Sequence, residues 1–175
     1  RGAHVLGRGQ AWVRRFDNAF LAGLAGGLPV LETGLERGAD GILYLRGLTI
    51  KAPALTLSGN GLRRRDGTFF FEGSGRQRQF GALTLKLDGP IARPRLDILL
   101  ARPNEGMDLR QVRLLLDPVA EGFGYSASGG SLIGPFTSKG MILLPRGGQT
   151  LIRIDDFNAS GLRAKGQIAP VAGGL

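Results

Sequence analysis

The feature that most constrains how this chain can fold is an alternation of apolar and polar residues with a period of two. It is clearest in residues 80–103, where Gly89-Pro90 separates two alternating runs. The apolar members of these runs are Leu83, Leu85, Leu87, Leu96, Ile98 and Leu100. Because successive side chains of a strand point to opposite faces of a sheet, this period predicts strands whose two faces meet different surroundings.

The same unit of strand, turn and strand recurs through residues 28–170. Its other alternating apolar positions are Val112, Leu114, Leu116, Ile152 and Ile154. The 30 glycines and 9 prolines are spaced as in the turns of all-β proteins, and Asn60-Gly61 and Asp66-Gly67 are hairpin-type dipeptides. Strands do not alternate with helices, which disfavours a parallel α/β fold, and their spacing predicts roughly ten or eleven strands.

One segment near the N-terminus has the period of a helix instead. Its apolar positions, which fall on one stripe of a helix, are Val13, Phe16, Phe20, Leu21 and Leu24. Gly26-Gly27 and Pro29 end the pattern. We therefore expect one short amphipathic helix over residues 12–25, which either packs on a sheet or borders an apolar groove.

Side chains that carry catalysis or bind metals are sparse. The sequence has no cysteine, which excludes thiolate catalysis, disulfides and cysteine-based zinc sites, and its one histidine is His4. Asp155-Asp156 is an adjacent acidic pair, but neighbours on a strand point to opposite faces of the sheet. Because no nucleophile, base and orienting group stand out together, we expect a protein that is not an enzyme and uses no metal or cofactor.

The net charge of +9 raises the question of an anionic partner. The densest basic run, Arg63-Arg64-Arg65, lies between the two hairpin-type dipeptides, so it is either a phosphate contact or a solvated turn. Binding of single-stranded nucleic acid needs aromatic residues interleaved with basic ones, whereas the aromatics of residues 69–71 stand together. We therefore expect no nucleic-acid partner.

No run of about 18 apolar residues occurs, so no membrane-spanning helix is expected in this sequence. The chain starts at Arg1 and ends within its repeat pattern at Leu175. We therefore expect residues 1–175 to be a single β segment of a longer protein, with sheet edges that are able to self-associate.

Two architectures fit the alternation. In a closed sandwich, two sheets bury their apolar faces against each other. In an elongated curved sheet, the apolar faces line one groove, and such a groove would exceed the few hundred Å² of apolar patch usual on a soluble monomer. An open groove therefore needs a ligand, and a strand of about seven residues spans roughly 23 Å, comparable with a fatty-acyl tail.

Three stretches resemble the repeat region of the TamB family of Gram-negative bacteria, with an alphaproteobacterial character. They are LTLSGNGLRRRDGTFFFEGSG (residues 55–75), FGALTLKLDGPIARPRLDILLARP (residues 80–103) and GPFTSKGMILLP (residues 134–145). The family is the translocation and assembly module, within the AsmA-like group of bridge-like lipid transfer proteins. The resemblance covers about residues 10–170 and rests on repeat phrases, so it carries over no individual functional residue.

The resemblance implies a protein that is anchored in the inner membrane by a helix outside this sequence and crosses the periplasm as a long β-groove, called a β-taco. It implies phospholipid transport between the inner and outer membranes. It also implies assembly or secretion of outer-membrane proteins together with a TamA-type outer-membrane partner. The expected fold is thus an elongated, curved, largely antiparallel sheet with an apolar groove and one short N-terminal helix.

On this basis we expect a non-enzymatic segment whose groove shields phospholipid acyl chains. The expected groove-lining residues are Leu83, Leu85, Leu87, Leu96, Ile98, Leu100, Val112, Leu114, Leu116, Ile152 and Ile154. The face that points inward stays open for residues 136–144, where both faces are apolar. Two other functions stay open: a module that accepts client strands at its sheet edges, and an adhesin-like structural sandwich without a ligand.

Overall fold

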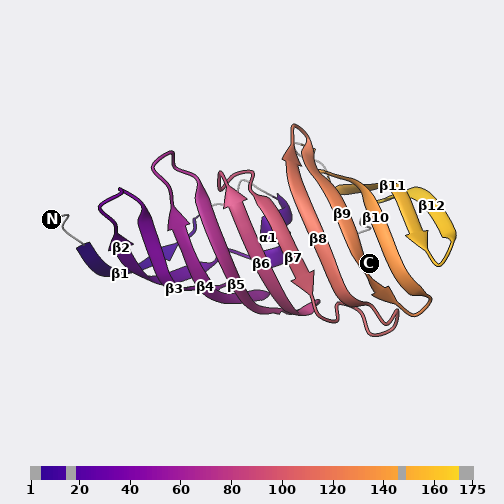
Figure 1. The fold of residues 1–175 in the computed structure, drawn as a ribbon, viewed down its shortest axis with the longest axis horizontal. Coiled ribbons are helices and arrows are strands. Elements are labelled where there is room, and N and C mark those ends of the chain that lie inside the picture. The colour runs from indigo at the N-terminus through magenta and orange to yellow at the C-terminus, as the bar shows by residue number, and fades with distance from the viewer. Residues whose placement is uncertain (1–4, 15–18, 146–148, 170–175) are drawn as a thin grey trace. The chain divides into compact units, whose positions relative to one another are not determined.

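Antiparallel strands make up most of the chain in the computed structural model, which describes residues 5–14, 19–145 and 149–169 (Figure 1). These residues contain twelve strands, whose order in the sheet is their order in the chain. They also contain one short helix, α1 (Ala19–Ala25). The all-β class and the antiparallel sheet expected from the alternation are therefore confirmed.

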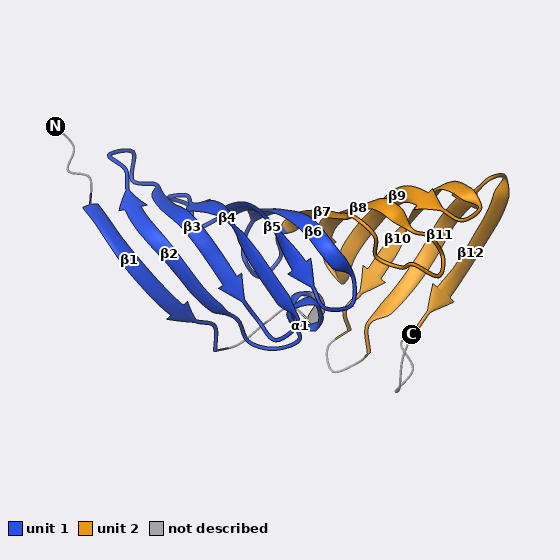
Figure 2. Cartoon of the chain, turned by 90° about the horizontal axis from the view of Figure 1, so that it is seen from below, with its two compact units in different colours: residues 1–94 blue, residues 95–175 orange. Residues whose placement is uncertain are grey.

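The chain divides into two compact units, which Figure 2 colours separately: unit 1 (Arg1–Pro94) and unit 2 (Arg95–Leu175). The described strands of unit 1 are β1 (Val5–Trp12), β2 (Val30–Arg37), β3 (Leu43–Lys51), β4 (Leu55–Arg63), β5 (Phe69–Gln77) and β6 (Gly81–Gly89). Those of unit 2 are β7 (Arg95–Leu100), β8 (Arg110–Val119), β9 (Gly122–Ser131), β10 (Gly134–Leu143), β11 (Leu151–Ala159) and β12 (Leu162–Ile168).

The helix is shorter than the sequence predicted. Trp12 ends β1 rather than starting a helix, so the predicted start at residue 12 is wrong. All eight residues of β1 pair in register with β2, and the Val13 N–H still donates to the Pro29 carbonyl at 3.1 Å. Ladder hydrogen bonds thus override the helical period up to this point. Phe16 lies outside the described residues.

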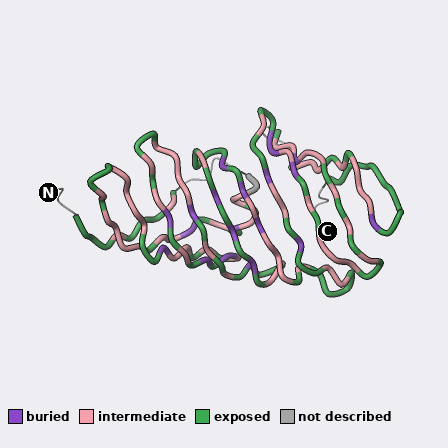
Figure 3. The backbone as a smooth tube through the Cα atoms, viewed as in Figure 1, coloured by how far each residue is buried: buried purple, intermediate pink, exposed green. Residues whose placement is uncertain are grey.

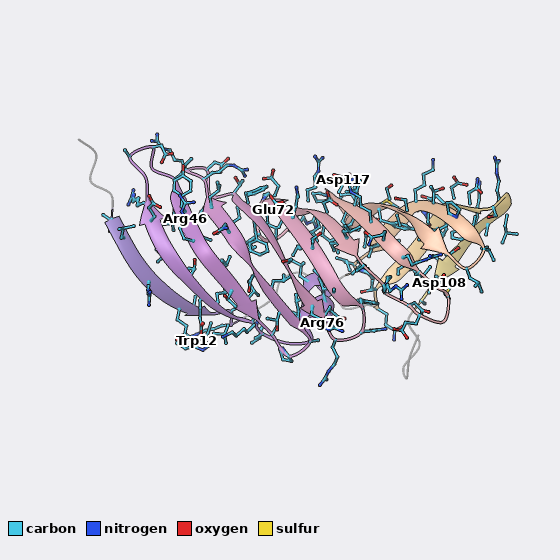
Figure 4. All side chains as sticks on the ribbon, turned by 60° about the horizontal axis from the view of Figure 1, so that its bottom comes forward. Trp12, Arg46, Glu72, Arg76, Asp108 and Asp117 are labelled. Carbon is cyan, nitrogen blue, oxygen red and sulfur yellow. The ribbon has the colours of Figure 1, made fainter. Side chains whose placement is uncertain are left out.

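The sheet of unit 1 has an apolar face and a charged face. The apolar face carries Leu31, Leu35, Leu45, Leu48, Ile50, Leu57, Phe71, Leu83, Leu85 and Leu87. The charged face carries cross-strand ion pairs, among them Lys86–Glu72 at 3.1 Å and Arg46–Glu36 at 3.1 Å. Arg46 and Glu72 are labelled in Figure 4. Each ion pair of this exposed kind adds little stability, so the apolar face is the main source of folding energy in the sheet.

A β-bulge keeps the apolar face continuous through β3. Leu45 and Leu48 are three residues apart, yet they pair with Gly61 and Gly59, which are two apart, so β3 holds one extra residue here. Gly47 takes the left-handed conformation that the bulge requires, with φ 58°, and its N–H donates to the Asn60 side chain at 2.9 Å. Asn60-Gly61 therefore lies inside β4 and is not a hairpin turn, which corrects that prediction.

The other predicted hairpin dipeptide forms a turn. Gly67 has φ 86°, and its N–H donates to the Arg64 carbonyl at 3.0 Å. Asp66 accepts a hydrogen bond from the Thr68 N–H at 2.9 Å, which closes an Asx-type turn between β4 and β5. The prediction of a turn at Asp66-Gly67 is thus confirmed. Gly67 supplies the positive φ that the turn needs, and the Asp66 side chain accepts a backbone hydrogen bond.

Glycines allow the backbones of β4 and β5 to come unusually close on the apolar face. Gly59 and Gly73 pair directly across the two strands, and Gly75 pairs with Leu57. A Cβ atom on Gly75 would overlap the carbonyl oxygen of Thr56, and one on Gly59 would overlap that of Glu72. The close approach therefore depends on the missing side chains, as is typical where a sheet bends sharply.

Substituting Gly75 by alanine should lower the free energy of unfolding by roughly 1–3 kcal/mol, because rigid backbone must move to admit the methyl group. Gly7→Ala is the matched control, since Gly7 also lies in a strand of unit 1 but has open space around its would-be Cβ. Thermal and urea unfolding of the two variants measure the difference. Equal stability of both would show that the close approach is not a structural requirement.

The strands of unit 2 bury apolar side chains, and Figure 3 colours the buried positions along the chain. Leu96 pairs with Leu116, and both are fully buried, as is Phe123 on β9. Register settles which side of residues 136–144 joins this face, because Ile142 pairs with Phe123. The rings of Phe136 and Phe157 stack with centroids 6.2 Å apart, and the Tyr125 hydroxyl bonds Ser138 at 2.9 Å.

Candidate functional site

An apolar cavity of about 620 Å³ lies within unit 1, on the apolar face of its sheet. Strands from β1 to β6 and the helix α1 all contribute to its wall. The main lining side chains are Val13, Leu21, Leu24, Leu31, Leu35, Leu45, Leu48, Ile50, Leu55, Leu57, Phe69, Phe71, Leu85, Leu87 and Ile91. Every one of them is aliphatic or aromatic, so the wall favours an apolar occupant.

The cavity exists because the sheet of unit 1 curls. Ala11 on β1 and Leu85 on β6 both line it, although five strand spacings separate them in the sheet order. At about 4.8 Å per spacing, a flat sheet would hold these two strands roughly 24 Å apart. The close backbone approach at Gly59 and Gly73 is one place where the absence of side chains permits the sheet to bend.

The polar side chains among the lining residues are already engaged elsewhere. Gln10 belongs to the charged face, where its amide donates to Glu32 at 3.2 Å. The Thr33 hydroxyl donates to the Gly34 carbonyl at 2.9 Å. Both groups thus already make hydrogen bonds within the protein, and the rest of the described cavity wall is apolar, so it selects mainly by shape and apolarity.

The helix α1 borders one end of the cavity and is tied to two turns. Leu24 and Ala25 are lining residues, and the Ala25 carbonyl accepts a hydrogen bond from the Ala54 N–H at 2.9 Å. The buried Gln77 donates to the Leu24 carbonyl at 3.4 Å and accepts from the Phe80 N–H at 2.8 Å. Figure 2 shows α1 beneath the strand ends of unit 1.

The predicted site residues of unit 1 lie on one face. Leu85 and Leu87 line the cavity. Leu83 shares their face and is buried, but it is not part of the cavity wall. Because all three are less than one tenth exposed, they also hold the sheet together.

The predicted site residues of unit 2 lie together on its apolar face and belong to its core. The fully or nearly buried members are Leu96, Ile98, Val112 and Leu116. The half-buried members are Leu100, Leu114, Ile152 and Ile154. Register joins them directly, since Ile98 pairs with Leu114 and Leu100 with Val112. None of them lines the cavity of unit 1.

Sequence reasoning missed the cavity residues on β1 to β5. Leu31, Leu45 and Ile50 belong to strands that were recognised but not assigned to the site, and Ala11 precedes the helix expected over residues 12–25 and was assigned to no strand. The bulge at Gly47 hides the common face of Leu45 and Ile50, because it changes their odd and even phase. The sequence does contain a signal for this bulge, because Gly47 interrupts the alternation of apolar residues, and a glycine within a strand pattern indicates a bulge.

Two carboxylates in the turns of unit 1 have lowered pKa values. The Ile42 N–H bonds Asp40 at 3.0 Å and is the largest cause of the lowered pKa of Asp40, and the Tyr44 hydroxyl adds a second bond at 3.0 Å. The same bond to Asp40 raises the pKa of Tyr44. Bonds from the backbone N–H and hydroxyl of Thr68 lower the pKa of Asp66. These groups stabilise turns.

Asp155-Asp156 lies at a β-bulge of β11, so the expectation that its side chains point to opposite faces does not apply there. Arg153 bonds Asp155 at 2.8 Å, which lowers the pKa of Asp155 and raises that of Arg153. Among the described residues, no group of three or more histidine, cysteine or acidic side chains could hold a metal ion. His4 lies outside them.

Comparison of the chain with protein-family models, with curated proteins and with solved structures gives no match. In the part of the chain that the structure describes, no helix is long and apolar enough to cross a membrane.

The hydrogen bonds to Asp66 give a pH dependence that NMR can measure. Its folded pKa should lie below the ordinary value of about 3.9, so its stabilisation is present above that value and is lost as the pH falls through the folded pKa. Titration of the side-chain carboxyl carbon tests this directly. A pKa at or above the ordinary value would contradict the turn geometry, and Asp66→Asn should remove this contribution to acid unfolding.

Proposed function

We propose that unit 1 binds the acyl chain of a lipid in its apolar cavity and shields it from water, without catalysing a reaction. The observation that carries the proposal is a cavity of about 620 Å³ whose lining side chains are almost all apolar. Sites for small ligands typically measure about 300–1,000 Å³, so the volume suits one or two hydrocarbon chains.

The dimensions of the strands also suit an acyl chain. The nine residues of β4 run the length of the cavity face and span roughly 30 Å. The acyl region of one membrane leaflet is about 15 Å thick, half of the hydrocarbon core. An extended acyl chain that lies along a strand therefore fits between the two ends of the sheet.

The resemblance to the TamB family gives this binding a cellular role within the proposal. The chain is then part of an inner-membrane-anchored protein in the periplasm, and its apolar faces belong to a β-taco groove that carries phospholipid between the inner and outer membranes. The segregation of apolar and ion-paired residues on opposite faces of unit 1 supports a groove with a dry inner wall and a wet outer wall.

A second candidate function is strand capture at β1, which comes first in the sheet order. Its exposed Val5, Leu6 and Trp12 lie on an eight-residue strand at one end of the described sheet, a surface suited to β-augmentation. The partner is then a strand of an outer-membrane client protein, assembled or secreted together with a TamA-type partner. A second copy of this chain is the competing occupant of the same edge.

Leu85→Arg should abolish retention of lipid, because it places a charge on the cavity wall. Thr84→Arg is the matched control, since Thr84 is the exposed neighbour on the charged face. Native mass spectrometry and organic extraction of the purified proteins measure bound lipid, and circular dichroism monitors folding. Retention of lipid by a folded Leu85→Arg variant would contradict the proposal.

A filling substitution avoids the burial of a charge. Ala11 is exposed but lines the cavity, so Ala11→Trp should displace the acyl chain and leave the fold intact. Leu6→Trp, on the charged face of the same strand and outside the cavity wall, should bind lipid as the unmodified protein does. Equal binding by these two variants would place the lipid elsewhere.

Strand capture predicts that association depends on β1 and not on the cavity. A proline at a β1 position whose N–H points away from β2 should prevent client or self-association, since proline removes the edge donor. Leu85→Arg should leave that association unchanged. Association is measured by analytical ultracentrifugation and by pull-down with a defined β-strand peptide of a client protein; loss in both variants would reject edge capture as a separate function.

A further inference from the structure

The structure separates the three arginines of the basic run at residues 63–65. Arg64 turns to the charged face, where it bonds Asp88 at 2.8 Å and the Thr68 hydroxyl at 3.2 Å. Arg65 lies beside Asp40, and its charge helps to lower the pKa of that carboxyl. Arg63 differs from both, because its guanidinium lies over the ring of Phe69, 5.9 Å from the centroid.

Arg63 and Arg37 lie on the apolar face at the end of the sheet away from α1. Register pairs Arg37 with Leu43, and Leu43 with Arg63, which in turn pairs with Phe69. Arg37 follows Leu35 on alternate positions of β2, and Phe69 is itself part of the cavity wall. The last row of the apolar face therefore carries two cations about 10 Å apart along the sheet, two strand spacings.

Neither of these two cations has a counter-ion among the described residues. Within residues 5–14, 19–145 and 149–169, neither Arg37 nor Arg63 takes part in an ion pair. The carboxylates of the neighbouring turns are occupied, since Asp40 and Asp66 accept backbone hydrogen bonds and Asp88 pairs with Arg64. Two like charges on the row of the apolar face that includes the cavity-lining Phe69 thus leave room for an anion between them.

We propose that Arg37 and Arg63 bind the anionic head group of an amphiphile whose hydrocarbon tail lies in the cavity. This inference rests on the proposed function, because the tail uses the same cavity. Arginine suits a phosphate or carboxylate group, since its planar guanidinium donates two parallel hydrogen bonds. The cation–π contact with Phe69 holds one of the two guanidinium groups at the rim.

The site has a polarity that fixes the ligand class. Its apolar end is bordered by Leu24 and Ala25 of α1, and its cationic end by Arg37 and Arg63. From Leu55, beside α1, to Arg63 the chain of β4 spans roughly 27 Å. A single-headed amphiphile with an anionic group therefore satisfies both ends, whereas a neutral hydrocarbon satisfies the cavity alone.

Calorimetric titration with three probes tests the inference: dodecyl phosphate, dodecanol and inorganic phosphate. The unmodified protein should bind dodecyl phosphate at least about tenfold more tightly than dodecanol, and added salt should reduce this preference. Arg37→Gln with Arg63→Gln should lower the affinity for dodecyl phosphate to within about twofold of that for dodecanol, and leave the affinity for dodecanol unchanged.

Arg76→Gln with Arg78→Gln is the matched control. It removes the same two charges from unit 1, but Arg76 lies on the charged face and Arg78 follows β5 near α1, so the preference for dodecyl phosphate should remain. Circular dichroism and thermal unfolding establish that both double variants are folded.

The outcomes separate the two proposals. If dodecanol does not bind, the acyl-binding function fails, and this inference fails with it. If dodecanol binds but the phosphate gives no preference, or if the preference survives the loss of Arg37 and Arg63, only the head-group site is overturned. If inorganic phosphate binds as tightly as dodecyl phosphate and does not compete with dodecanol, the rim is a free-anion site, which also overturns the amphiphile assignment.

Discussion

The structure depends on keeping apolar and charged side chains on opposite faces of each sheet. Where a strand gains a residue, the sequence supplies a bulge that restores the phase, as Gly47 does in β3 and Asp155-Asp156 in β11. Without the bulge, a one-residue slip would turn every following side chain to the wrong face. The continuous apolar face therefore depends on the bulges as well as on the leucines.

The two units bury their apolar faces to different extents. In unit 2, large side chains such as Phe123, Leu96 and Leu116 are fully buried, and the face is packed as a core. In unit 1 the sheet curls around a space that its own side chains do not fill. An unfilled apolar space loses dispersion contacts on its wall, so an apolar occupant such as the proposed lipid would stabilise unit 1.

The sequence predicted the features that depend on local chemistry. Alternation identified the strands and the common face of Leu83, Leu85 and Leu87, and Asp66-Gly67 identified a turn, because these signals act between near neighbours. It failed where long-range pairing decides the outcome. Trp12 belongs to β1 because it pairs with Val30 of β2. Asn60-Gly61 lies inside β4 because β4 pairs with β3 on one side and with β5 on the other.

The candidate site was only partly predictable for the same reason. Periodicity shows that a side chain shares a face with its neighbours, but not whether that face encloses a cavity or a core. Leu85 and Leu116 therefore looked equivalent in sequence, although Leu85 lines the cavity and Leu116 is fully buried in unit 2. The difference arises from curvature, which glycines such as Gly59 and Gly73 permit through backbone contacts that the period of two does not encode.

The ends of the cavity constrain how a lipid could move in the proposed function. The helix α1 borders one end of the cavity, where Ala54 and Gln77 donate hydrogen bonds to the last carbonyls of the helix. A lipid held by its head group at the arginine rim cannot leave along the strand direction on the α1 side. Movement is then confined to the direction perpendicular to the strands, from one strand to the next, where the apolar face repeats. In the proposed function, a repeating face bordered by α1 on one side and by arginines on the other would favour passage of lipids in a single orientation.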